Sequence, residues 1–248
     1  MILARIANAI RTQNWFAVAL EFVIVISGVV IGFQVTAWNE VRSERVLEYR
    51  YLERLHDAVT ADQIEFDDAA NLASERAAQV RAIIRAIEGP DNVTAEPADF
   101  IRSVITAAYT YTPPVDRVAF DELTTRGDIA ILRNEDLRAA IAAYYLSLDS
   151  YSQWNYLRAH VQTQYMSLRN GVLTASQERL WTDENVAAGL TSADAAAVIA
   201  RIAERPELVG WLAQVEAWQQ LNETTFASAA ERADALATVL GAELETME

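Results

Sequence analysis

The side chains that could carry acid–base or metal chemistry are not spaced in a way that suits it. His56 and His160 are the only histidines, and neither belongs to a His-x-x-x-His or His-Glu-x-x-His pattern. Adjacent carboxylates occur as Asp67-Asp68, Asp121-Glu122 and Glu135-Asp136. Neighbouring positions diverge around a helix, so these pairs are poorly placed to act as general acid and base. We therefore expect no metal site and no catalytic carboxylate pair.

Other kinds of catalytic site are also missing from the sequence. There is no glycine-rich phosphate loop, no Gly-x-Ser-x-Gly elbow and no cysteine, which excludes thiol nucleophiles and disulfides. The 248 residues include 35 acidic and 20 basic side chains, a formal net charge of −15, and every basic residue is an arginine. Nucleic acid is excluded as a partner because phosphate binding needs a surplus of positive charge. We predict a protein that is not an enzyme and needs no cofactor.

An apolar stretch of 24 residues runs from Trp15 to Trp38 and contains one charge, Glu21, and no proline. As a helix it is roughly 36 Å long, enough to cross the ~30 Å hydrocarbon core of a bilayer. A tryptophan then lies at each membrane interface. We predict a transmembrane helix over residues 15–38. The alternative is a signal peptide cleaved near Val35-Thr36-Ala37, but this apolar region is longer than the about 7–15 residues of a signal peptide.

One face of this helix combines small residues with a carboxyl group. Gly28 and Gly32 form a GxxxG step with Ser27 beside it, and Glu21 lies within about 20° of both glycines on the helical wheel. A charge in lipid costs at least about 2.5 kcal/mol, so we expect this face to pack on another membrane helix. The alternative is a monomeric anchor in which Glu21 reaches the headgroups.

Residues 1–14 are expected to form an amphipathic segment at the membrane interface. Ile2, Ile6 and Ile10 share a stripe, and Arg5 and Arg11 lie off it, where they meet lipid headgroups. Arginines flank the span on both sides, so the positive-inside rule decides little. A short segment before a long apolar helix is the layout of an uncleaved signal anchor. We therefore expect a single-pass protein of the bacterial inner membrane with a periplasmic C-terminal domain.

The remainder of the chain reads as all-helical. It holds 34 of the acidic and 18 of the basic residues, with few glycines or prolines and no sustained period-2 pattern. A long stalk helix is predicted over residues 39–88, ended by Gly89-Pro90. Residues 89–248 are predicted to form a helical bundle that packs on the stalk. Its helices are expected at 97–109, 135–168, 192–204 with Ser192 as cap, and from Pro206 onward.

The most distinctive stretch is a predicted helical corner over residues 119–138. Gly127 suits the left-handed position that closes one helix, and Asn134 can cap the next. Ile129, Ile131 and Leu132 are expected to fill the corner. The corner residues that we single out are Phe120, Leu123, Gly127, Asn134, Tyr144 and Tyr145. The following helix shows core spacing at Leu137, Ile141, Tyr144, Tyr145, Leu148, Tyr151, Trp154 and Leu157.

Two segments, 21–40 and 120–145, resemble a family of single-pass bacterial envelope proteins classed as a domain of unknown function. The first matches a Glu-initiated apolar span ending in Gln-x-x-x-Trp-Asn-Glu, here Gln34, Trp38, Asn39 and Glu40. The second matches a Phe-x-Glu-Leu motif followed by Gly, Asn, Leu-Arg and Tyr-Tyr, from Phe120 to Tyr145. The resemblance implies an architecture and brings no known activity.

These patterns favour a membrane-anchored, non-enzymatic accessory or scaffold subunit. Its partners would be membrane lipid and other membrane protein subunits, or further copies of itself. The alternative is a periplasmic ligand-binding sensor, which would have to signal through a partner because the sequence shows no second span.

Overall fold

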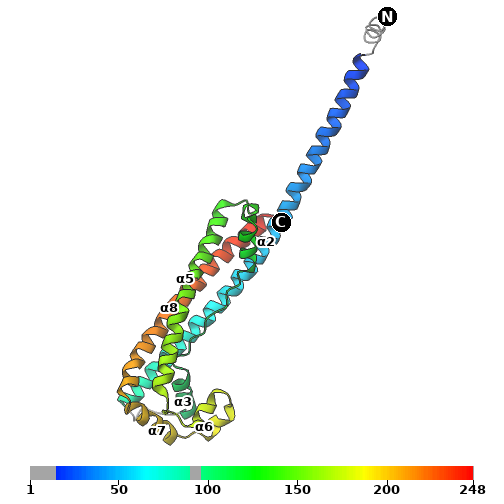
Figure 1. Cartoon of the computed structure of the whole chain (residues 1–248). Helices are drawn as coiled ribbons and strands as arrows, with labels where there is room; N and C mark the ends of the chain where they lie inside the picture. Colours follow the sequence, from blue (N-terminus) through cyan, green and yellow to red (C-terminus); the bar gives the residue numbers. More distant parts are fainter. Residues whose placement is uncertain (1–14, 90–95, 248) are drawn as a thin grey trace, which may run out of the picture. The chain divides into compact units, whose positions relative to one another are not determined.

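A computed structural model describes residues 15–89 and 96–247, and within these ranges the regular structure is helical, with no strand. The predicted all-helical class is confirmed. In chain order the described helices, with η marking 3-10 helices, are α2 (Trp15–Glu88), α3 (Pro97–Thr106), α4 (Val118–Thr125), η2 (Asp128–Ile131), α5 (Glu135–Arg169), α6 (Ala175–Glu178), η3 (Arg179–Trp181), η4 (Glu184–Gly189), α7 (Ser192–Ala203) and α8 (Pro206–Met247) (Figure 1).

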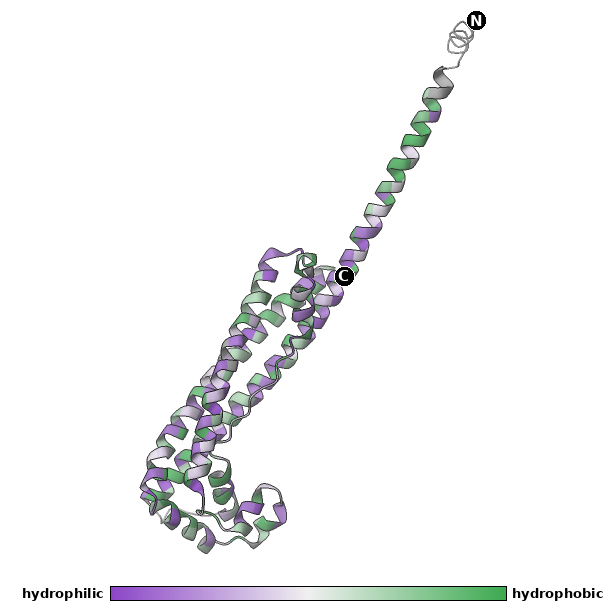
Figure 2. Cartoon of the chain, in the orientation of Figure 1, coloured by the Kyte–Doolittle hydropathy of each residue, from purple (hydrophilic) through white to green (hydrophobic). Residues whose placement is uncertain are grey.

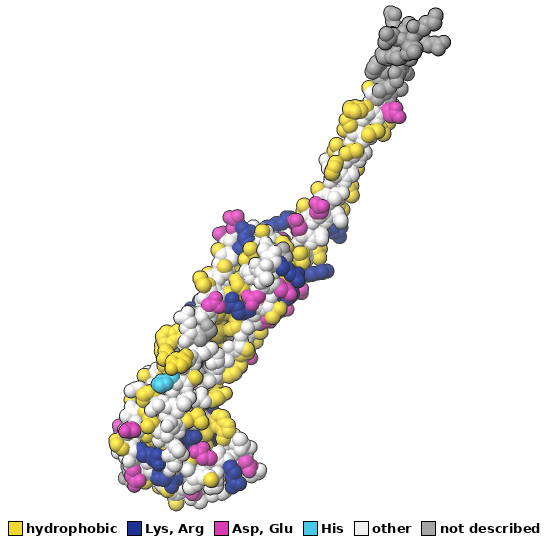
Figure 3. Space-filling view, viewed as in Figure 1, with side chains coloured by type: hydrophobic (Ala, Val, Ile, Leu, Met, Phe, Trp, Pro, Cys, Tyr) yellow, Lys and Arg dark blue, Asp and Glu magenta, His cyan; other side chains and the backbone are white. Residues whose placement is uncertain are grey.

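The chain divides into two compact units, one ending at Tyr51 and the other beginning at Leu52, and α2 contributes to both. In the first unit, twelve large apolar side chains between Leu20 and Trp38 are 45–74% exposed. Figure 2 colours this part of α2 as mostly hydrophobic, and Figure 3 shows hydrophobic side chains along it. Among the described helices, this one is long and apolar enough to span a membrane.

The core of the second unit is built from the apolar faces of three long helical stretches: residues 52–88 of α2, α5 and α8. The Phe66 ring of α2 lies 6.4 Å from the Phe226 ring of α8 and 6.0 Å from the Tyr151 ring of α5. Helices α5 and α8 lie side by side (Figure 1). Each fully buried Leu, Ile or Phe stabilises the fold by about 1.5–3 kcal/mol. The α2 segment buries Leu52, Leu55, Val59, Phe66, Val80 and Ile83.

At one end of this unit, α3, η3, α7 and the start of α8 pack around the C-terminal part of α5. Helix α3 contacts α7 and η3, and α7 contacts α8. Their shared cluster of buried residues includes Val80, Ile83, Ile101, Val104, Tyr165, Val172, Leu180, Val198, Ile202, Leu208, Leu212 and Val215. This packing fixes α3, α6 and η3 against α5, and these elements form the wall of the pocket described below.

Several predicted helix boundaries are confirmed. Gly127 adopts the left-handed conformation with φ +74°. Asn134 caps α5, because its Oδ1 accepts a hydrogen bond from the Leu137 amide at 3.1 Å. Pro206 is the first residue of α8, where its missing N–H costs nothing.

Two boundaries differ from prediction. Helix α3 ends at Thr106 and not at Tyr109, and the Gln219 side chain binds the carbonyl oxygens of Ala107 and Tyr109 at 2.9 and 3.1 Å. The cap of α7 is Thr191 and not Ser192. Thr191 and Asp194 form a reciprocal capping box. This motif requires the cap to lie three residues before the acidic residue, and Thr191 meets that requirement whereas Ser192 does not.

The prediction of core residues is wrong for part of α5. Trp154 and Leu157 are 44% and 40% exposed. Here the inward position of α5 belongs to Arg158, which is 5% exposed and hydrogen-bonds Asn222 of α8 at 3.3 Å. In the corner Leu132 is buried, whereas Ile129 and Ile131, which lie on the 3-10 helix η2, are only half-buried.

Candidate functional site

The predicted packing face of the apolar helix is open in the described structure. Glu21, Ser27, Gly28 and Gly32 all lie on the continuous helix α2 and are exposed. A Cβ atom added at Gly28 or Gly32 meets no described atom within 4 Å. Another helix could therefore approach this face closely without moving any described part of the chain.

The predicted interface residues fall partly outside the described residues. Arg5 and Arg11 lie outside them, and Trp15 is the first residue of α2, with no side chain described. Trp38 is 64% exposed, and the Arg42 guanidinium lies 5.8 Å from its ring centre. An exposed aromatic ring beside an arginine suits the boundary between hydrocarbon and headgroups.

The predicted corner residues are brought together by aromatic contacts. The Phe120 and Tyr145 rings stack with centroids 4.3 Å apart, and Tyr144 meets Tyr145 edge-on at 5.1 Å. Leu123 is fully buried. Besides capping α5, Asn134 donates a hydrogen bond to Glu243 of α8 at 2.8 Å, so the corner is tied to the last helix.

The corner is completed by three residues that the sequence did not single out: Asp62, Asp116 and Arg117. Asp62 accepts hydrogen bonds from the Tyr144 hydroxyl at 2.8 Å and from the Asp116 amide at 3.1 Å. The Tyr145 hydroxyl donates to the Asp116 carbonyl at 3.2 Å.

Arg117 binds the Asp149 carboxylate at 2.6 Å and lies over the rings of Phe120 and Tyr145. In the sequence, Asp62 occupies a core position of the helical pattern, between Val59 and Phe66. A carboxylate at a position where the pattern expects an apolar residue was the sequence signal for this cluster.

Burial sets the protonation of this cluster. It raises the pKa of Asp62 from 3.8 to about 6, although the two hydrogen bonds lower it. Burial also raises the pKa of Tyr144 and of Tyr145, so both hydroxyls stay protonated and donate. The hydrogen bonds of Asp62 and Tyr145 hold α2, the segment before α4 and α5 together, which is a structural role.

The two histidines lie apart from this cluster. His56 lies near Gly241 of α8, and its Nδ1 is 3.6 Å from the Asp57 carboxylate. His160 is exposed on α5. Among residues 15–89 and 96–247, no group of three or more histidine, aspartate or glutamate side chains is arranged to hold a metal ion.

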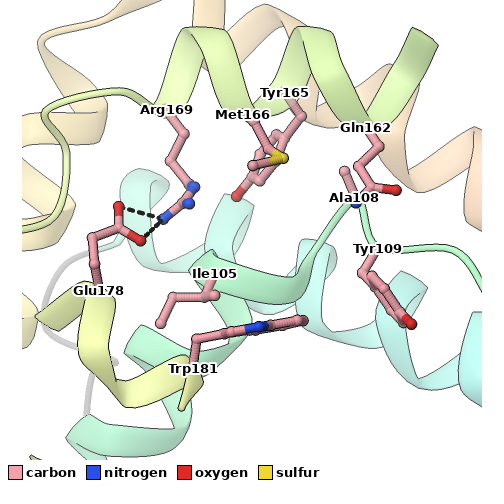
Figure 4. Close-up of a pocket in the computed structure, with 9 residues that line it drawn as sticks. All are labelled: Ile105, Ala108, Tyr109, Gln162, Tyr165, Met166, Arg169, Glu178 and Trp181. Atoms are coloured by element: carbon pink, nitrogen blue, oxygen red, sulfur yellow. Dashed lines mark hydrogen bonds and ion pairs between the residues drawn. The ribbon is translucent and has the colours of Figure 1, made fainter. Parts of the chain in front are cut away.

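A pocket of about 300 Å³ opens at the other end of α5, and the sequence did not predict it (Figure 4). Four of its residues occupy one face of α5 at spacing i, i+3, i+4 and i+7. The lining residues are Ile105 of α3, Ala108 and Tyr109 after it, Gln162, Tyr165, Met166 and Arg169 of α5, Glu178 of α6 and Trp181 of η3. The volume lies at the lower end of the range of about 300–1,000 Å³ that is usual for ligand pockets.

The polar side of the pocket is the ion pair of Arg169 and Glu178. Nη1 of Arg169 donates to both carboxylate oxygens, at 3.0 and 3.1 Å (Figure 4). The Arg169 side chain is only 9% exposed, whereas that of Glu178 is 42% exposed. A buried guanidinium held at one nitrogen is a preorganised recognition group.

The apolar side is made by Met166 and Trp181, which are 52% and 53% exposed. The Tyr109 ring meets the Trp181 ring edge-on at 5.8 Å and holds it in place. The Tyr165 hydroxyl donates to the Val104 carbonyl at 2.7 Å, which fixes α5 to α3 behind the pocket. The signal in the sequence was a mixed polar and apolar face at 162, 165, 166 and 169, beside a tryptophan in an irregular segment.

Comparison with protein families gives one match. The model of DUF6090, a family of unknown function, matches residues 21–180. The match takes in the apolar helix from Glu21, the corner and the pocket residues up to Glu178. No curated protein and no solved structure matches the chain. The resemblance to a family of unknown function is therefore confirmed at this level, and the chain belongs to the DUF6090 family.

Proposed function

We propose that the protein is a membrane-anchored, non-enzymatic accessory or scaffold subunit. It crosses the bacterial inner membrane once through residues 15–38 and presents an acidic helical bundle on the periplasmic side. The observation that carries this proposal is the exposure of twelve large apolar side chains between Leu20 and Trp38.

The magnitude of that exposure favours a lipid environment. Each large apolar side chain left in water lacks up to about 1.5–3 kcal/mol of the stabilisation that full burial would give. Twelve such side chains together exceed the about 5–15 kcal/mol that stabilises a typical domain. A bilayer removes this cost, and the helix satisfies its own backbone hydrogen bonds there.

The open face of the span supports an assembly role. Gly28 and Gly32 leave room for a second helix, and Glu21 on the same face is costly unless it is paired or reaches water. A second copy of the span, or a helix of a larger membrane complex, would supply the contact.

Anchoring and orientation are tested together in cells. Sodium carbonate washing should leave the full chain in the membrane fraction. Alkaline phosphatase fused after Glu248 should be active, and green fluorescent protein fused at the same place should be dark. Release by carbonate refutes the anchor, and the reverse reporter pattern refutes the periplasmic placement.

A ligand-binding sensor is the second candidate, and the pocket at Arg169 and Trp181 favours it. Mass determination after mild detergent extraction discriminates between the two functions. A stoichiometric complex supports the scaffold, whereas a monomer whose melting temperature rises with a small molecule supports the sensor.

A further inference from the structure

We propose that the pocket between α3, α5, α6 and η3 binds a small aromatic carboxylate. The ring would lie against Trp181 and Met166, and the carboxylate would bind Arg169. This inference deepens the ligand-binding alternative and does not depend on the scaffold proposal.

The first support is the state of the Arg169 guanidinium. Its two hydrogen bonds to Glu178 both leave from Nη1. Its Nε is buried and has no hydrogen-bond partner among the described residues. An unpaired buried donor costs about 1–3 kcal/mol, more when it is charged, and a ligand acceptor would remove that cost. The edge formed by Nε and Nη2 is one of the forks with which arginine binds a carboxylate through two parallel hydrogen bonds.

The second support is the local charge. The chain as a whole carries a formal charge of −15, yet two further arginines, Arg201 and Arg205, lie beside the C-terminal end of α5. Arg201 donates to the Val172 carbonyl and the Gln177 amide oxygen, and Arg205 donates to the carbonyls of Leu168 and Asn170.

These acceptors are uncharged. Neither Arg201 nor Arg205 forms an ion pair within 4 Å among the described residues. Arg201 also interacts electrostatically with Asp194, which offsets part of its charge. Arg205 has no acidic partner within residues 15–89 and 96–247 and lies next to the neutral Arg169–Glu178 pair, so the site favours an anion over a cation.

The third support is the shape of the apolar wall. Trp181 and Met166 are about half exposed although they line a concave surface, and the edge-on contact with Tyr109 holds the indole ring in place (Figure 4). A planar ring stacks on an indole with little loss of entropy, and a thioether adapts to its edge. The volume of about 300 Å³ suits a molecule of one or two fused rings and excludes a long acyl chain.

The probe is 2-naphthoate, and 2-naphthamide is its uncharged analogue. Isothermal titration calorimetry of the full chain in detergent micelles, with micelles alone as the blank, measures both. We expect saturable binding of one 2-naphthoate per chain, at least tenfold tighter than 2-naphthamide. Absence of saturable binding, or equal affinity for the two probes, overturns the proposal.

Variants assign the binding to this pocket. W181A should weaken 2-naphthoate at least tenfold, and R169K, which keeps the charge but removes the fork, should do the same without weakening 2-naphthamide. The matched control is W154A, because Trp154 is also exposed on the surface but lies outside the pocket. Thermal melting verifies that each variant is folded. If R169K does not fold, the W181A result alone decides whether 2-naphthoate binds in this pocket. Unchanged binding in W181A overturns the proposal.

Discussion

The Tyr144 hydroxyl donates a hydrogen bond of 2.8 Å to the Asp62 carboxylate, joining α5 to the middle of α2 inside the core. Asp62 is only 2% exposed, and the Asp116 amide donates to its other oxygen at 3.1 Å. A carboxyl group in this position keeps both hydrogen bonds whether it is charged or protonated, since the tyrosine hydroxyl can donate or accept. Its protonation therefore changes stability without changing the contacts.

Asp62 makes the stability of the second unit depend on pH. Its pKa is about 6 in the folded chain, against 3.8 for the ordinary side chain. Between these two pH values the folded state binds more protons than the unfolded state. The contribution of Asp62 to folding stability is therefore fully present below about pH 4 and is lost as the pH rises through 6. We expect the free energy of unfolding to fall by about 2 kcal/mol between pH 4 and pH 7 because of Asp62.

Replacement of the acid isolates this dependence. D62N keeps both hydrogen bonds, because its amide can donate to Tyr144 while its carbonyl accepts from Asp116. Thermal melting from pH 4 to pH 7 should show the wild type losing stability relative to D62N. The control D67N alters an exposed acid on the same helix and should track the wild type. A pH-independent difference between wild type and D62N contradicts the assignment.

The Phe120–Tyr145 stack is expected to stabilise the corner. An aromatic pair contributes about 0.5–1.5 kcal/mol beyond its buried area, and Arg117 lies over both rings. F120A should therefore lower the free energy of unfolding by about 2 kcal/mol, measured by denaturant titration. V118A, at a position 60% exposed on the same helix, should change it by less than about 0.5 kcal/mol. Equal effects from the two substitutions would mean that the stack does not stabilise the fold.

The long helices and several of their ends could be predicted because local chemistry determines them. Gly127, Asn134 and Pro206 each act within four residues of their own position, and such effects are visible in a sequence. The apolar helix was equally visible, because its composition alone sets it apart from the rest of the chain.

The interior contacts could not be predicted in the same way. Asp62 meets a tyrosine 82 residues away, and Arg158 meets an asparagine 64 residues away. Both hydrogen bonds depend on which helices become neighbours in the fold. The periodicity of apolar residues in the sequence does not determine this. For the same reason the spacing of Trp154 and Leu157 indicated a core, although Arg158 occupies the inward position.

Gly127 is expected to be required for its conformation and not for lack of space. Its φ is +74°, and a Cβ added there meets nothing within 4 Å. G127A should destabilise the second unit by about 1–2 kcal/mol, since left-handed backbone is costly for a residue with a Cβ.

Gly210 gives the matched control, because it lies in α8 with equal open space and ordinary helical backbone. G210A should stabilise by about 0.5–1 kcal/mol. Opposite signs in thermal melting support the explanation, and a loss of stability in both variants contradicts it.

Self-association of the span is expected to depend on Gly28 and Gly32. Leucine at both positions would fill the groove that lets a second helix approach, and no described residue would have to move to accept it. G28L/G32L should therefore reduce the signal of a membrane dimerisation reporter to that of a monomeric span.

The matched control for that reporter is I26L/V30L. These two positions lie about 120–160° from the glycines on the helical wheel, on the far side of the same helix, and leucine keeps them apolar. Its signal should equal that of the wild type. E21Q tests the carboxyl group by itself. A signal below that of the wild type shows that the carboxyl group takes part in the helix contact, whereas an unchanged signal means that the contact rests on packing of the glycines. A wild-type signal from G28L/G32L would show that the span does not associate through this face.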